Sequence, residues 1–434
     1  MQKLILSFAI GTLATTSCLA AEVDSVSVLS ELTYGYASEI DASVHGLLEI
    51  SPTVDVSLTE AASLVTSARI RLDSEDELEP GRASLNTYAS ASRPLALGTA
   101  GSAEIRDFYL EFRAQDGLAR FGKQQIVWGR LDGIKVLDLV NPQDFSEFIL
   151  DDFAESRIAL WSAYFDYSFG NWRAELAVVP DGTGHAIPSS GAWFELTAPR
   201  FRYGAEAGQP GPPVVTAKPG HSLDETAAGL RLSREIGSAE FSVVAYSGID
   251  PEPLGRIIIS NGKPIVERFN ERMEVLGFSL DIGLGQSILR AEYAYQPERI
   301  FNTRSIDGLQ NIALDQSRGA IGLDIDGPWG VFVNMQYLVD FVSGAPAELV
   351  RPDRDRIGTL FLRKSFAYDT ITLEARWYRS FTDEDNLASL SFEYAFNDST
   401  SLELAAHSFS GTEDGLFGQF AERDRITLSL SHVF

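Results

Sequence analysis

The last eleven residues, Asp424-Arg-Ile-Thr-Leu-Ser-Leu-Ser-His-Val-Phe434, alternate between apolar and polar side chains. The apolar residues of one parity are Ile426, Leu428, Leu430 and Phe434, and the polar residues of the other are Thr427, Ser429 and Ser431. Successive side chains of a β-strand point to opposite faces, so this stretch predicts a strand with one apolar and one polar face. Two settings produce such a strand: the edge of a soluble β-sandwich and the wall of a membrane-spanning barrel.

The same alternation recurs in segments of strand length along the chain, as in 64–73, 107–113, 289–295, 329–341, 371–378 and 389–396. Tight-turn dipeptides separate pairs of strands at Asp116-Gly117, Gly170-Asn171, Gly237-Ser238, Gly285-Gln286, Asp326-Gly327, Asp369-Thr370 and Asn397-Asp398. The alternate connections are longer and mostly polar, at 74–102, 129–156, 181–223, 249–269, 298–313, 342–354, 379–388 and 411–423. Short turns at one end and long loops at the other are typical of outer-membrane barrels.

The composition agrees with a barrel. No apolar run of about 18 residues follows the first 21, which argues against a transmembrane helix, and a sheet satisfies its backbone in lipid only when it closes. Trp172, Trp329 and Trp377 fall near strand ends on the apolar face, as in an aromatic girdle. We therefore predict an all-β fold, a single-chain transmembrane antiparallel barrel of about 16–18 strands. Pro52 leaves the strand pattern of 28–59 open.

The first residues predict a secretory signal peptide at 1–21, followed by the barrel at 22–434. Lys3 is the positive residue, an apolar stretch follows it, and Leu19-Ala-Ala21 offers a cleavage site. Cys18 is the only cysteine and lies in a poor lipoprotein signal, which is the alternative. Cleavage at Ala20 or Ala21 leaves no thiol for disulfides or zinc–thiolate sites.

The net charge of −26, from 61 acidic and 35 basic residues, argues against a nucleic-acid partner. The sequence has none of the common hydrolase, zinc-protease or phosphate-loop motifs, and its five histidines are scattered. We expect no enzymatic activity and no cofactor. A hydrolase assembled from distant strands, with His407 near Glu403, is the enzymatic alternative.

The segment from Gly122 to Arg157 differs from the other long connections. Residues 134–140 are largely apolar, and Asn141-Pro142 is a typical helix start that would place Phe145, Phe148 and Ile149 on one helical face. Since a loop with its own apolar face must bury that face, we predict a loop with a short helix folded into the lumen. The alternative is a lid packed over the mouth of the barrel.

Two motifs carry a resemblance to a known family. Gly122-Lys-Gln-x-x-x-Trp-Gly129, followed by Asn141-Pro-x-Asp144, resembles an uncharacterised, porin-like family of large Gram-negative outer-membrane β-barrels, in which Arg is common at the place of Lys123. The last strand is similar to the signal read by the barrel-assembly machinery through a terminal aromatic, here Phe434, although His432 stands where a further aromatic is frequent. The resemblance implies an outer-membrane location, with lipids and lipopolysaccharide as neighbours.

The polar face of the predicted strands mixes arginines with carboxylates. Facing rows of these charges either orient solutes across a constriction or join the strands as ion pairs. The acidic runs 73–79 and 383–385 either hold divalent cations or are simply solvated, and neither has calcium-loop spacing.

The sequence predicts a channel for passive or weakly selective passage of a solute of unknown identity, with loop 130–156 as constriction or plug. The candidate pore-lining residues are Lys123, Arg130, Lys135, Asp138, Asp144, Asp151, Asp152, Arg157, Arg113, Arg290 and Arg376. One alternative is a barrel of a lipid or hydrophobic-compound transport or export system, with 134–140 and 145–153 touching an apolar substrate. Another is a structural or adhesive barrel that binds a partner through loop 181–224.

Overall fold

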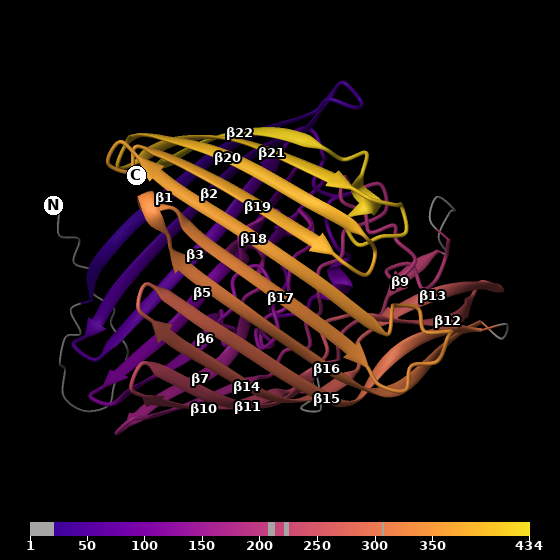
Figure 1. The fold of residues 1–434 in the computed structure, drawn as a ribbon, viewed down its shortest axis with the longest axis horizontal. Coiled ribbons are helices and arrows are strands. Elements are labelled where there is room, and N and C mark those ends of the chain that lie inside the picture. The colour runs from indigo at the N-terminus through magenta and orange to yellow at the C-terminus, as the bar shows by residue number, and fades with distance from the viewer. Residues whose placement is uncertain (1–20, 207–212, 221–224, 306–307) are drawn as a thin grey trace, which may run out of the picture.

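A closed ring of antiparallel strands dominates the computed structural model, which describes residues 21–206, 213–220, 225–305 and 308–434. Eighteen long strands form one sheet in this part of the chain, and β1 (Glu22–Ala37) pairs with β22 (Arg425–Val433) to close it (Figure 1). The predicted fold class and the upper end of the predicted strand number are therefore confirmed. The predicted signal peptide, apart from Ala21, lies outside the described residues.

Each barrel strand pairs with the next barrel strand along the chain. Between β1 and β22 the barrel strands are β2 (Ala42–Thr59), β3 (Ala62–Asp73), β5 (Gly101–Ala114), β6 (Gly117–Gln124), β7 (Leu160–Phe169), β8 (Trp172–Val179), β10 (Ala227–Ile236), β11 (Ala239–Ile249), β14 (Arg272–Leu284), β15 (Ser287–Ser305), β16 (Gly308–Asp326), β17 (Phe332–Val342), β18 (Arg354–Phe366), β19 (Ile371–Ser380), β20 (Asp385–Asn397) and β21 (Thr400–Ser410). Pro52 lies inside β2, where no pairing with β3 is formed at 51–52.

The connections contain the remaining elements. They are β4 (Ala96–Leu97), β9 (Val214–Thr216), β12 (Leu254–Ser260), β13 (Lys263–Phe269), the helix α1 (Phe153–Ser156) and the 3₁₀ turns η1 (Leu85–Thr87), η3 (Pro328–Gly330) and η4 (Gly418–Phe420). β12 and β13 form a hairpin that projects past the barrel strands, with β9 parallel to β13 (Figure 1). Within the described ranges, no helix has the length and apolar character needed to span a membrane.

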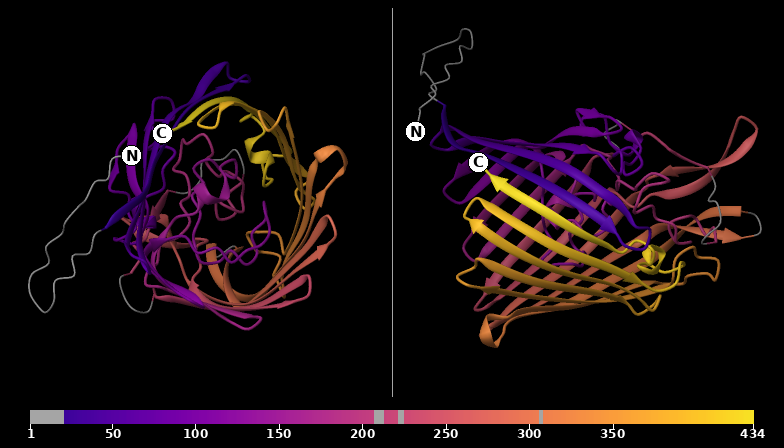
Figure 2. Two further views of the ribbon diagram at one scale, coloured as in Figure 1. Left: turned by 90° about the vertical axis from the view of Figure 1, so that its left-hand side faces the viewer. Right: turned by 90° about the horizontal axis from the view of Figure 1, so that it is seen from above.

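The two ends of the barrel differ as the sequence predicted. Each of the seven predicted turn dipeptides lies wholly or partly in a short connection between consecutive barrel strands, with Gly117, Asp326 and Asn397 as terminal residues of their strands. These turns lie at the end where β22 finishes, which we call the turn end; the long connections lie at the other end, the loop end (Figure 2, right). The predicted long connections 298–313 and 379–388 are wrong: 298–305 and 308–313 belong to β15 and β16, which stay paired along nearly all of these residues, and only 381–384 separate β19 from β20.

The outer surface of the barrel is apolar. On β22, Ile426, Leu428 and Leu430 are exposed on the outside, whereas Thr427 is buried on the inside. Trp329 and Trp377 are exposed at 85% and 42%, and β3, β10, β16 and β20 also expose large aliphatic side chains. A belt of outward apolar residues over a polar interior is the pattern of a lipid-facing barrel wall.

The segment 125–159, between β6 and β7, is folded inside the ring (Figure 2, left). Its Trp128 and Leu137 have no exposed surface and belong to a core formed with inward-facing residues of the barrel wall. Most of those wall residues are small or aliphatic, among them Ala177, Val244, Val275, Ala294, Ala320 and Leu338, and Tyr164, Tyr246 and Met273 are the larger exceptions. The apolar face of the segment is thus buried against the wall, as predicted.

Glycines on the wall make this close packing possible. A Cβ atom on Gly229 of β10 would lie 2.5 Å from the ring of Trp128, and one on Gly322 of β16 would lie 2.8 Å from Leu131. A real Cβ cannot approach another atom so closely without displacing it. The wall is therefore shaped to receive this segment.

The prediction of a helix that begins at Asn141 is wrong. Residues 145–150 form consecutive turns with Phe148 at φ 54°, and the short helix is α1, further along the segment. The Asn141 side chain does not cap a helix. Its Oδ1 accepts a hydrogen bond from the Ile126 backbone N–H at 2.7 Å, and its Nδ2 donates to the Ile158 carbonyl at 2.8 Å. This amide joins the two ends of the segment, and its long-range partners outweigh the local helix signal.

We predict that Gly229→Ala destabilises the folded barrel, because the added methyl group displaces the Trp128 ring from the wall. Overpacking of this kind costs about 1–3 kcal/mol, which urea unfolding in lipid vesicles can measure. The matched control is Gly319→Ala on the outer face of β16, where the Cβ would lie 3.7 Å from Tyr293, an ordinary contact. Equal stability of the two variants would contradict the packing argument.

Candidate functional site

The folded-in segment divides the lumen into regions of different character. Its apolar residues 126–140 cover the inner face of the wall from β8 to β17. The opposite wall, formed by β1, β2 and β19–β22, borders a cavity of about 560 Å³. We call this space the polar cavity, because carboxylate, guanidinium and hydroxyl groups dominate its strand lining.

The polar cavity extends along the barrel axis. Near the turn end it is bordered by Thr372, Ser401 and Ser431, which lie close to the ends of their strands. Near the loop end it is bordered by His45 and Arg425. One continuous space therefore runs beside the folded-in segment for most of the length of the wall.

Carboxylates outnumber guanidinium groups around the polar cavity. Among the described residues, Glu31, Glu393 and Glu403 border it without an ion-pair partner, and Glu31 only accepts hydrogen bonds from hydroxyl groups. Glu393 of β20 and Glu403 of β21 are directly opposite each other in the register. Like charges opposite each other destabilise a sheet, so this acidic wall costs stability. It gives the cavity a negative potential that attracts cations.

The loop end of the polar cavity holds two carboxyl groups that titrate near neutral pH. Burial, and then the neighbouring Glu147, raises the pKa of both Asp76 and Asp151 to about 7. Asp151 is enclosed by protein although part of its surface reaches the cavity. Burial acts in the same direction on Glu147, but Arg425 at 2.6 Å outweighs it and holds the pKa of Glu147 at about 2.

Three of the sequence-predicted residues line the polar cavity: Asp151, Asp152 and Arg376. Asp152 lies on the folded-in segment and Arg376 on β19, and their charged groups are 3.6 Å apart. This ion pair spans the space between segment and wall. Arg376 also contacts Glu374 on its own strand at 3.0 Å.

The other predicted residues lie elsewhere in the lumen or at its edge. Lys135 and Asp138 border a second cavity, and Lys135 and Arg157 both pair with Asp138, at 3.6 and 2.8 Å. The side chain of Arg130, a residue of the segment, pairs with Glu240 of β11, and their charged groups are 2.5 Å apart.

The remaining four predicted residues are Arg290, Asp144, Lys123 and Arg113. Arg290 pairs with Asp324, Asp144 lies 3.7 Å from Arg82, Lys123 is buried on β6, and Arg113 pairs with Glu111 at the turn end. None of these four borders either cavity, and a role of the predicted residues in gating stays a prediction.

Many lumenal arginines form ion pairs between neighbouring strands. This was one of the two interpretations of the mixed arginines and carboxylates on the polar face. Arg231 of β10 lies 3.4 Å from both Glu175 and Glu240, and Arg71 lies 2.8 Å from Glu49.

Glu31 and Glu403 were not predicted from the sequence as cavity residues. Their parity on the polar face was the available signal, whereas their lack of a basic partner depends on the register. Within the described ranges, no group of three or more His, Cys, Asp or Glu is arranged to hold a metal ion.

The second cavity, of about 440 Å³, lies at the loop end and is mainly apolar; we call it the apolar cavity. It is enclosed by residues 133–149 of the segment, by 185–203 of the connection between β8 and β10, and by the loop ends of β14–β19. Ile149 and Tyr378 border both cavities, so they form the partition between them.

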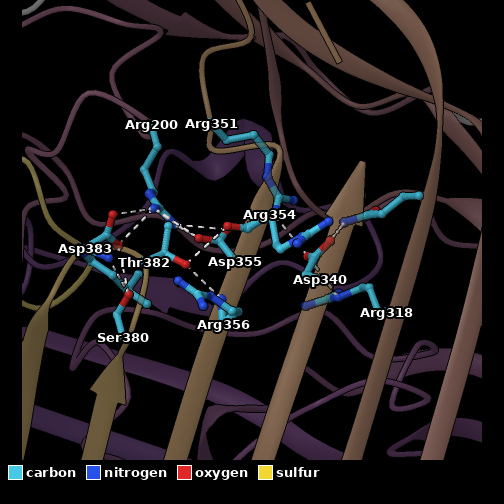
Figure 3. A network of polar contacts seen from close by, with 12 residues as sticks. Arg200, Arg318, Asp340, Arg351, Arg354, Asp355, Arg356, Ser380, Thr382 and Asp383 are labelled. Atoms are coloured by element: carbon cyan, nitrogen blue, oxygen red, sulfur yellow. Dashed lines mark hydrogen bonds and ion pairs between the residues drawn. The ribbon is translucent and has the colours of Figure 1, made fainter. Parts of the chain in front are cut away.

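A network of charges fastens the connection 185–203 over the apolar cavity (Figure 3). Arg200 of this connection lies 2.9 Å from Asp383 and 3.2 Å from Asp355. Asp355 in turn contacts Arg351 at 2.8 Å. Arg351 and Arg318 both pair with Asp340, at 3.0 and 3.3 Å. Alternating charges from β16 to the turn after β19 thus hold the connection in place.

Solved structures support the fold at very low sequence identity. OccAB1 of Acinetobacter baumannii is 8% identical, with a TM-score of 0.51 over 95% of this chain and 96% of that chain. OccK2 (OpdF) of Pseudomonas aeruginosa, solved in complex with glucuronate, is 8% identical, with a TM-score of 0.50 over 94% of this chain and 97% of that chain. This similarity concerns the barrel fold. No curated protein matches the sequence.

A family model matches residues 73–406, a range that contains both motifs on which the resemblance was based. The coarse prediction, an uncharacterised family of outer-membrane-type barrels, is confirmed, whereas the diagnostic value of the two motifs stays a prediction. The matched range covers most of the chain. The chain therefore belongs to the family described as protein of unknown function (DUF1302), and it has the fold of a porin-like barrel.

Proposed function

We propose that this barrel is an outer-membrane channel that lets small polar solutes pass, with a preference for cations. The observation that carries the proposal is the polar cavity, which runs beside the folded-in segment from the turn end toward the loop end. The apolar outer belt and the porin-like fold support an outer-membrane location. In such barrels the short turns face the periplasm, so the turn end is the periplasmic end.

The folded-in segment acts as the constriction in this proposal. It occupies the inner face of β8–β17, which restricts a passing solute to the opposite wall. The Asp152–Arg376 ion pair crosses that path at 3.6 Å, and the half-exposed Arg376 and exposed Asp152 can separate at low cost. Transient separation of Asp152 from Arg376 would widen the path without unfolding the segment.

The partners that we propose are those of an outer-membrane barrel. Outer-membrane lipids and lipopolysaccharide would surround the belt, and the barrel-assembly machinery would read the last strand with Phe434. We propose no enzymatic activity and no cofactor. Part of the connection 181–224, the candidate for the adhesive alternative, is buried at Asp181, Thr183 and Phe194, whereas Val214 and Val215 of β9 are exposed, so the adhesive alternative stays a prediction. The apolar cavity favours the hydrophobic-compound alternative.

We predict steady single-channel steps in planar bilayers and a cation-selective reversal potential in a salt gradient. Glu393→Gln/Glu403→Gln should lower the cation preference by roughly two-fold at low salt, because it removes the facing carboxylates of the acidic wall. The control is Glu413→Gln in an exposed loop, which should change nothing. A folded barrel without conductance, or with anion selectivity, would overturn the proposal.

Deletion of residues 134–150 should raise the single-channel conductance, because it removes part of the segment that fills the lumen. The same planar-bilayer recording measures it. Deletion of the exposed residues 412–414, at the tip of the connection between β21 and β22, serves as the control and should leave conductance close to that of the full chain. Unchanged conductance after the first deletion would exclude the constriction role.

Cation preference should fall as the pH drops through about 7. Below that pH, Asp76 and Asp151 bind protons and the polar cavity loses negative charge, since the pKa of each is raised to about 7. Reversal potentials recorded between pH 5 and 9 would show the change. Asp76→Asn/Asp151→Asn should flatten the profile near neutral pH, and a profile identical to that of the unmodified protein would refute the assignment.

A further inference from the structure

The apolar cavity has the size and surroundings of a ligand site. Its volume of about 440 Å³ falls in the range of roughly 300–1,000 Å³ typical of small-molecule pockets, which combine apolar walls with a few polar groups. Phe148 and Phe201 contribute aromatic walls, and Ile187 and Ile357 contribute aliphatic ones. A path for polar solutes has no need of such walls, so the proposed channel leaves this cavity unexplained.

The basic groups around the apolar cavity are mostly neutralised by carboxylates. Arg299 lies 2.6 Å from Asp250 and 2.7 Å from Glu252. The other paired cations are Lys135, Arg200, Arg318 and Arg351, which contact Asp138, Asp355, Asp340 and Asp355, respectively. These paired groups hold the surrounding segments together and add little net charge to the cavity.

Arg268 of β13 is different. Its Nε donates a hydrogen bond to the Tyr203 hydroxyl at 3.0 Å, and among the described residues no carboxylate lies within ion-pair distance of its guanidinium group. Arg268 borders the apolar cavity, and within the described ranges its two terminal nitrogens have no hydrogen-bond partner. Two parallel N–H groups of a guanidinium match the two oxygens of a carboxylate, and such charge-assisted bonds are strong.

We propose that the apolar cavity binds an amphipathic monocarboxylate. Its aliphatic or aromatic body lies among Phe148, Ile187 and Phe201, and its carboxylate contacts Arg268. The site does not require that the barrel conduct ions. Ile149 and Tyr378 separate the bound molecule from the polar cavity, so the ligand is held at the loop end until this partition moves.

The test uses the complete barrel in lipid nanodiscs, with empty nanodiscs subtracted. Octanoate is the probe and octanamide, which has the same chain without the charge, is the matched neutral compound. Isothermal titration should show saturable binding of octanoate to one site per barrel, with octanamide weaker. Arg268→Gln should weaken octanoate binding by about ten-fold and leave octanamide binding unchanged. Arg256→Gln, an exposed arginine on β12 paired with Glu267, should leave both unchanged.

A second pair of variants tests the cavity itself. Ile357→Trp fills the space and should abolish binding of both compounds, whereas Ile321→Trp, on the exposed outer face of β16, should preserve it. A heat-modifiable band on gels verifies that each variant is folded. Binding no greater than in empty nanodiscs, or octanoate binding that survives both Arg268→Gln and Ile357→Trp, would overturn the proposal. Because this test measures binding and not conductance, its failure would leave the proposed channel standing, and absence of conductance would leave the proposed ligand site standing.

Discussion

The contact between Trp128 and Gly229 determines how the interior of this barrel is arranged. A ring of eighteen strands encloses more space than its own inward side chains fill, and the segment 125–159 occupies one side of that space. It can do so because the wall presents glycine, alanine and valine where the segment presents Trp128, Leu131 and Leu137. The polar cavity exists on the opposite side because no matching apolar surface is found there. One packing interface thus separates a filled half of the lumen from an open half.

Charge is distributed according to the same division. On the wall covered by the segment, arginines are paired, as with Arg231 between Glu175 and Glu240, because a buried unpaired charge is very costly. On the open wall, water can solvate an unpaired carboxylate, so Glu393 and Glu403 can face each other there. The chain carries a large excess of acidic residues, and part of that excess is exposed to the lumenal solvent. The acidic wall is therefore tolerated where the segment does not cover it.

The sequence predicted the fold well because a barrel is encoded locally. Alternation in stretches such as 371–378 and turns such as Gly170-Asn171 depend on neighbouring residues alone. The helix start predicted from the local sequence at Asn141 is wrong, because the Asn141 amide binds the backbone at Ile126 and Ile158 instead of capping a helix. The apolar cavity could not be predicted, because 133–149, 185–203 and the ends of six strands meet only after the barrel has closed. The isolation of Arg268 likewise depends on which distant carboxylates fold next to it.

The position of the segment along the chain also limits how the barrel can assemble. Trp128 and Leu131 precede the glycines that receive them, Gly229 and Gly322, by about a hundred and about two hundred residues, respectively. The segment cannot complete its docking until β10 and then β16 have joined the sheet. Contacts of such long range form slowly. Pairing of β1 with β22 afterwards closes the ring around the docked segment, which is then retained topologically as well as by its contacts.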